Sequence, residues 1–171
     1  MKKLARLTAL LLTGALLLVL TACGTVAEPE TEQQAKQRLL KEINSYRTSI
    51  KLDPLEEVEL LSEAEQELIE HFRAAGKNGL SEQERDEALD RWNDKTDGWS
   101  YCADFGWEWD DNESIYFLSA KVPANTSKGK AELLTVLKDC PAFNTSNCKS
   151  IGIAVVTVKG QMYWSCTVFQ E

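Results

Sequence analysis

The chain contains a single histidine, His71, and this residue limits the acid–base chemistry that the protein can perform. An imidazole transfers protons efficiently near neutral pH, and it needs a carboxylate partner within hydrogen-bonding reach. The candidate partners are Asp104 and Glu108, so one hypothesis is a remnant hydrolase that uses His71 with either carboxylate. The simpler interpretation places His71 on a helix face, because it follows Leu68 by three positions in an apolar helical stripe.

The N-terminus indicates a second kind of chemistry, lipidation at Cys23. Residues 1–22 begin with three basic residues and continue with an apolar run that is short for a membrane span. The run ends in Leu20-Thr21-Ala22 before Cys23, which resembles a bacterial lipobox. We expect residues 1–22 to be a signal peptide and Cys23 to carry a diacylglyceryl group with palmitate-like chains, followed by a tether at 23–33. Two acyl chains, at about 0.8 kcal/mol per buried methylene, give a stable membrane anchor.

The charge balance of the exported part excludes some partners. Removal of residues 1–22 takes away three positive charges and no acidic residue, so the net charge changes from −8 to −11. Such a surface repels the phosphates of nucleic acids and anionic lipids. We therefore expect no nucleic acid partner, and we expect the acyl chains alone to hold the protein on the extracytoplasmic face of the bacterial cell envelope.

Four further cysteines lie in the exported part: Cys102, Cys140, Cys148 and Cys166. An even number outside the cytoplasm predicts two disulfides, for which three pairings are possible. We expect Cys140 to pair with Cys148 across a short polar loop, and Cys102 to pair with Cys166. No C-x-x-C spacing is present, which argues against a thiol-redox or zinc-ribbon site.

The strongest structural signal is a β-hairpin over residues 151–169. Two runs rich in β-branched and aromatic residues flank Lys159-Gly160, which is typical of a two-residue turn. This turn predicts a register with the facing pairs Val158/Gln161, Thr157/Met162, Val155/Trp164, Ile153/Cys166 and Ile151/Val168. One face of the hairpin is then almost entirely apolar, and the other carries small residues, so helices are expected on both faces.

Capping boxes and apolar spacing predict the helices. Thr31 to Gln34 and Ser81 to Glu84 have the form of capping boxes that start helices at about 32–50 and 82–92. A second helix is expected from Asp53-Pro54 to about Ala75, with Asp53 as its N-cap. A fourth is expected at 131–138. Residues 99–109 contain three tryptophans that either pack the core or line an aromatic groove.

Four stretches in this order resemble the CAP superfamily of cysteine-rich secretory, antigen 5 and pathogenesis-related proteins, which includes bacterial SCP-like domains. They are Ile43 to Arg47 (N-x-x-R), Leu52 to Leu55 (L-x-P-L), Leu133 to Phe143, and the closing strands with Ile151-Gly-Ile-Ala-Val and Tyr163-Trp164. The resemblance covers about residues 36–170. It implies an α+β fold: an α-β-α sandwich at 34–171 with a central, mostly antiparallel sheet and helices on both faces.

The departures from the family pattern bear on function. The family cavity carries two histidines and two glutamates and often a divalent metal. Here Phe143 stands where one histidine belongs, and Ala103 replaces a glutamate in the stretch that resembles Y-G-E-N-L-A-W. The candidate groove residues that the resemblance implies are His71, Tyr101, Ala103, Asp104, Trp107, Glu108 and Phe143. We therefore expect no catalytic residues, no metal and no cofactor.

Our interpretation is a binding module for a hydrophobic small molecule, a lipid or a peptide. The alternatives are the remnant hydrolase described above and a structural or adhesive surface protein without a pocket. An apolar ligand is favoured by the aromatic cluster beside a cavity that has lost its charged residues.

The lipid anchor can be tested by the Cys23→Ser substitution. Because the serine hydroxyl cannot form the thioether that carries the lipid, the variant should move from the detergent phase to the aqueous phase in a phase-separation experiment. A variant that stays in the detergent phase with an unchanged N-terminal lipid contradicts the assignment.

Overall fold

The computed structural model describes residues 29–75, 80–110 and 115–170. The chain forms two units, Met1–Glu30 and Thr31–Glu171, and almost all of the described residues belong to the second. The expected signal peptide, Cys23 and most of the tether lie outside the described residues. None of the helices in the described part of the chain has the length and apolarity that a membrane span requires.

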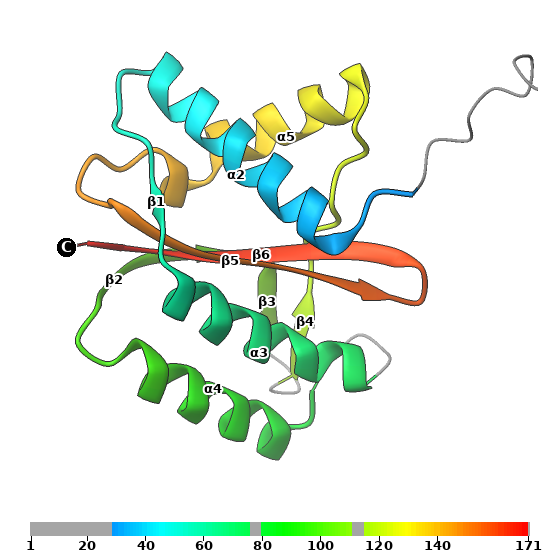
Figure 1. Cartoon of the computed structure of the whole chain (residues 1–171). Helices are drawn as coiled ribbons and strands as arrows, with labels where there is room; N and C mark the ends of the chain where they lie inside the picture. The colour runs from blue at the N-terminus through cyan, green and yellow to red at the C-terminus, as the bar shows by residue number, and fades with distance from the viewer. Residues whose placement is uncertain (1–28, 76–79, 111–114, 171) are drawn as a thin grey trace, which may run out of the picture. The chain divides into compact units, whose positions relative to one another are not determined.

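The second unit is an α+β domain, as expected, and Figure 1 shows its helices on both sides of a sheet. The elements in chain order are α2 (Glu32–Ser49), β1 (Glu56–Glu57), α3 (Glu59–Ala75), α4 (Glu82–Thr96), β2 (Ser100–Phe105), β3 (Trp107–Asp110), β4 (Ile115–Leu118), α5 (Ser127–Asp139), the 3₁₀ helix η1 (Pro141–Phe143), β5 (Ser150–Val158) and β6 (Gln161–Gln170). A mixed sheet of order β1-β5-β6-β2 lies between α2 and α5 on one face and α3 and α4 on the other. Strands β3 and β4 form a separate two-stranded sheet.

The hairpin register is confirmed throughout. Strands β5 and β6 pair from Val158 with Gln161 at the turn to Ser150 with Phe169 at the far end. Both turn residues have positive φ, 50° for Lys159 and 79° for Gly160, as a two-residue hairpin turn of type I′ requires. Because side chains alternate along a strand, the predicted apolar residues lie on one face of the sheet and the predicted small residues on the other.

The predicted helix starts are confirmed at two of the caps. The side chains of Thr31 and Ser81 each accept a hydrogen bond from the backbone amide three residues later. The side chains of Gln34 and Glu84 in turn accept a hydrogen bond from the backbone amide of the cap residue. Helix α4 continues to Thr96, beyond the expected end near residue 92. The hydroxyl of Thr96 donates a hydrogen bond to the carbonyl of Trp92 within this additional turn of helix.

The second helix begins later than the sequence predicts. Asp53 and Pro54 do not start it; instead Glu56 and Glu57 form β1, which runs parallel to β5. The amide of Glu56 donates to the carbonyl of Lys149 at 2.7 Å, and that of Val58 donates to Ile151 at 3.1 Å. Pairing with the sheet thus overrides the local helix signal, and α3 starts at Glu59.

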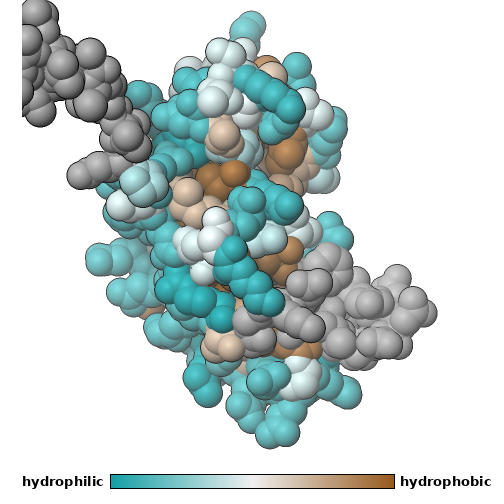
Figure 2. Space-filling view, turned by 90° about the vertical axis from the view of Figure 1, so that its right-hand side faces the viewer, coloured by the Kyte–Doolittle hydropathy of each residue, from teal (hydrophilic) through white to brown (hydrophobic). Residues whose placement is uncertain are grey.

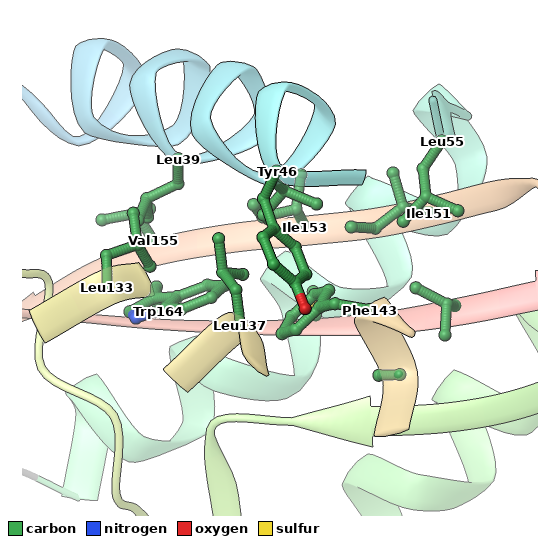
Figure 3. Close-up of a cluster of buried hydrophobic side chains, with 14 of the residues drawn as sticks. Leu39, Tyr46, Leu55, Leu133, Leu137, Phe143, Ile151, Ile153, Val155 and Trp164 are labelled. Atoms are coloured by element: carbon green, nitrogen blue, oxygen red, sulfur yellow. The ribbon is translucent and has the colours of Figure 1, made fainter. Parts of the chain in front are cut away.

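Each face of the sheet has its own apolar core. The cluster under α2 and α5 contains Ile151, Ile153 and Val155 of β5 together with Trp164 of β6 (Figure 3). The cluster under α3 and α4 is smaller and is built on Ala154 and Val156. The prediction that both faces of the hairpin are covered is therefore confirmed.

The small residues on the second face allow α3 to approach β5 closely. A Cβ at Gly152 would lie 2.5 Å from the backbone oxygen of Leu61 in α3, which is far inside van der Waals contact. Glycine at this position therefore sets the distance between the helix and the strand, and hence the place of every α3 side chain that reaches the sheet.

Two side chains of α2 hold the loops around β1 and β5. Asn44 exchanges two hydrogen bonds with the backbone of Leu55, at 2.8 and 3.0 Å. Arg47, 1% exposed, donates to four backbone carbonyls on the two loops. The acceptors are the carbonyls of Asp53, Phe143, Thr145 and Cys148. These are the polar residues of the N-x-x-R stretch, and they fix the loops that precede β1 and β5.

Candidate functional site

The residues expected to form one groove lie on different faces of the sheet. Ala103 pairs with Val168 and packs against the cluster under α2 and α5, whereas Asp104 pairs with Thr167, which points to the α3 side. Phe143 is fully buried and stacks on Trp164, so it fills the first core rather than lining an opening (Figure 3).

The hydrolase candidates are not brought into hydrogen-bonding contact. His71 is half-buried on α3. Asp104 accepts a hydrogen bond from the hydroxyl of Tyr101 at 2.6 Å, and Glu108 is exposed on β3. In the described residues, no hydrogen bond or ion pair joins His71 to either carboxylate.

A buried carboxyl group that sequence reasoning did not single out lies between α3 and the sheet. Glu65 is 0% exposed, and its Oε2 accepts hydrogen bonds from Thr167 Oγ1 at 3.0 Å and from Trp92 Nε1 at 3.3 Å. Ser165 and Trp107 are also close enough to lower its pKa. Among the described residues, Oε1 of Glu65 has no hydrogen-bond partner.

Burial dominates the acidity of this group. It raises the pKa of Glu65 to about 7, and the four polar neighbours oppose the rise only in part. The group is enclosed by α3, α4 and β6, so a substrate cannot reach it. The sequence did not indicate that Glu65 is buried. Glu65 shares the apolar stripe of α3 with Leu61 and Leu68, but a glutamate next to Ala64 in such a stripe is usually exposed.

An open cleft lies between α2 and α3 at the side of the sheet. Its volume is about 690 Å³, within the range of ligand sites. The lining residues come from α2, β1, α3 and β5: Glu32, Gln33, Lys36, Glu57, Glu59, Ser62, Glu63, Gln66 and Val155. Four of these nine residues are glutamates and one is a lysine.

The floor of the cleft is the edge of β5. Strand β1 pairs with Ser150 and Ile151 only, and no other strand in the described residues pairs with this edge of β5 further along. Side chains meet the edge instead. Ser62 Oγ accepts from the amide of Ile153 at 3.2 Å, and Gln66 Nε2 donates to the carbonyl of Val155 at 3.4 Å. Glu32 accepts from the amide of Thr157 at 2.7 Å.

Two ion pairs at the cleft compensate part of its negative charge. Lys36 pairs with Glu57 at 2.6 Å, and Arg73 pairs with Glu32 at 2.6 Å. Although burial raises the pKa of Glu32, the hydrogen bonds from Thr157 and Arg73 outweigh it and hold that pKa below its usual value. Glu59 and Glu63 are exposed and form no ion pair within the described residues.

Comparisons with family models, with curated proteins and with solved structures found no match for this chain. In the part of the chain that the structure describes, no group of three or more histidine, cysteine, aspartate and glutamate side chains is placed to hold a metal ion. The cleft between α2 and α3 is therefore considered as a candidate ligand site.

The four downstream cysteines gather on the face of the sheet under α2 and α5, and all are free thiols. Cys102 and Cys148 are in hydrogen-bonding contact, and burial together with this contact raises the pKa of Cys148. The expected pair of Cys102 and Cys166 is not favoured by the register, because Cys166 lies opposite Phe105. Three residues of strand span about 10 Å, whereas disulfides need Cα atoms within about 7 Å.

We expect oxidation to join Cys102 to Cys148 rather than to Cys166, since contact decides which thiols pair. Peptide mapping of the oxidised protein under non-reducing conditions identifies the link. The variant Cys148→Ser should lose this bridge, while Cys140→Ser should keep it. A map that links Cys102 to Cys166 or Cys140 contradicts this prediction.

The raised pKa of Glu65 makes stability depend on pH. The native state holds the proton up to about pH 7, whereas the unfolded chain releases it near pH 4.5. The unfolded state therefore binds fewer protons between these values, and the free energy of unfolding falls as the pH rises through this window. Glu65→Gln has no proton to lose. Its free energy of unfolding relative to the wild type should rise by roughly 2–3 kcal/mol between pH 5 and pH 8.

Chemical denaturation at several pH values measures this difference. The matched control is Glu63→Gln, an exposed glutamate on the same helix. Its stability should follow that of the wild type at every pH. Parallel curves for Glu65→Gln and the wild type would show that Glu65 is ionised in the folded protein at neutral pH.

Proposed function

We propose that this chain is a lipid-anchored, extracytoplasmic binding module of the bacterial cell envelope, with a CAP-like domain that binds rather than catalyses. The layered arrangement of helices around a mixed sheet supports the CAP-like assignment (Figure 1). The ligand site is the cleft between α2 and α3, and its ligand is a cationic peptide.

The observation that carries this proposal is the uncompensated negative charge of the cleft. Glu59 and Glu63 are exposed at the cleft and one helical turn apart, so they present two carboxylates in a row. Ion pairs with Lys36 and Arg73 neutralise only the other two glutamates. The net charge of −11 on the exported part also attracts cationic ligands from a distance.

An apolar ligand, which the aromatic residues led us to expect, has less support. Phe143 is enclosed in the core with Phe105 and Trp164 around it. On the face shown in Figure 2, hydrophobic residues occur as small separate patches among hydrophilic ones. A peptide, which the sequence analysis also named as a ligand class, fits a cleft lined by polar and charged side chains better.

The test uses the full-length protein in detergent micelles and two fluorescent octapeptides, one alternating Lys and Val and one alternating Glu and Val. The Lys-Val peptide should bind and the Glu-Val peptide should not, as measured by fluorescence anisotropy. The double variant Glu59→Gln/Glu63→Gln should weaken binding by about 2- to 30-fold, since each exposed charge pair contributes about 0.2–1 kcal/mol.

The control is Glu132→Gln, which removes an exposed glutamate of α5 that does not line the cleft. It should leave the affinity for the Lys-Val peptide unchanged. Equal affinities for both peptides, or no effect of the double variant, would show that the cleft does not select positive charge.

A further inference from the structure

The cleft has a property beyond its charge: its floor is a strand edge with the geometry of a docking site for another strand. In the hairpin register, the backbone groups of Ser150, Ala154 and Val158 face β6. Those of Ile153, Val155 and Thr157 therefore face the cleft. Three side chains bond to this edge where a neighbouring strand would otherwise lie.

Helix α3 runs along β5 in the same direction. The hydrogen bonds between them show that successive turns of the helix lie beside every second residue of the strand. Ser62 reaches Ile153 and Gln66 reaches Val155, so four residues of helix correspond to two residues of strand. The rises agree, since four helical residues span about 6.0 Å and two strand residues about 6.7 Å. Figure 1 shows α3 alongside β5 at this side of the sheet.

The same agreement applies to Glu59 and Glu63, which are also four residues apart on α3. Their carboxylates are about 6 Å apart along the helix axis. In an extended peptide laid on the edge of β5, every second side chain points to the same face. Basic residues at alternate positions of such a peptide would therefore meet Glu59 and Glu63 in turn.

We propose that the ligand binds as an added strand along the edge of β5 at residues 153–157, with basic side chains at alternate positions directed at Glu59 and Glu63. This mode rests on the proposed function, because it uses the same cleft. The backbone hydrogen bonds of the added strand replace those from Ser62, Gln66 and Glu32. The edge of β5 thus loses its hydrogen bonds to side chains and gains hydrogen bonds to the main chain of the peptide. The ion pairs of the basic side chains with Glu59 and Glu63 select the sequence of the peptide.

The experiment uses the full-length protein in detergent micelles, the Lys-Val octapeptide and two N-methylated analogues of it. One analogue is methylated at the backbone nitrogens of all lysines, and the other at those of all valines. Because N–H groups of a strand alternate in direction with the side chains, one set faces β5 and the other faces away. One analogue should bind at least 10-fold more weakly than the parent, and the other within about 3-fold.

The outcomes separate this inference from the proposed function. If the parent peptide does not bind, the proposed function is wrong and the strand mode with it. If the parent binds and the analogues bind equally well, or are weakened to the same degree, the cleft holds cationic peptides but not as a strand. Hydrogen exchange gives a second readout, since the amides of Val155 and Thr157 should become at least 10-fold better protected when the parent peptide is bound. Unchanged protection overturns the strand mode.

Discussion

The buried guanidinium of Arg47 is the constraint on which the rest of the domain depends. A charge with 1% exposure is tolerated only when its donors are satisfied, and here four main-chain carbonyls accept from it. These carbonyls belong to the loop before β1 and to the segment that runs from the last residue of η1 to β5. The side chain therefore joins two segments that are far apart in sequence and brings β1 beside the start of β5. Strand β1 ends at Glu57 because α3 begins at Glu59, and the edge of β5 beyond Ile151 is left open.

An open strand edge is a risk that soluble proteins limit, because it can pair with other chains. This domain limits the risk with charge and with side chains that bond to the edge. Glu32, Ser62 and Gln66 occupy three of its polar groups, and further glutamates flank it. The side chains and glutamates that discourage uncontrolled pairing also give the cleft its negative charge. Protection of the edge and selection of a ligand therefore have a common physical basis.

The sequence was sufficient to predict what depends on local chemistry. The turn at Lys159-Gly160 set the register of the hairpin, and the boxes at Thr31 and Ser81 set two helix starts. It was insufficient where tertiary contacts decide. Asp53-Pro54 carries a sound helix-start signal, but pairing with β5 takes Glu56 and Glu57 into the sheet. The cleft and the buried carboxyl of Glu65 arise from elements that meet only in the folded domain, so no spacing in the sequence reveals them.

The topology also has a consequence for the order in which the domain can form. Every strand of the four-stranded sheet pairs with β5 or β6, and these two follow all other elements in the chain. Helices α2 to α4 and strand β2 therefore have no sheet to pack on until the ribosome has completed the hairpin. Assembly of the sheet then depends on pairings between residues that are far apart in sequence, such as Glu56 with Ser150, and contacts of this kind slow folding.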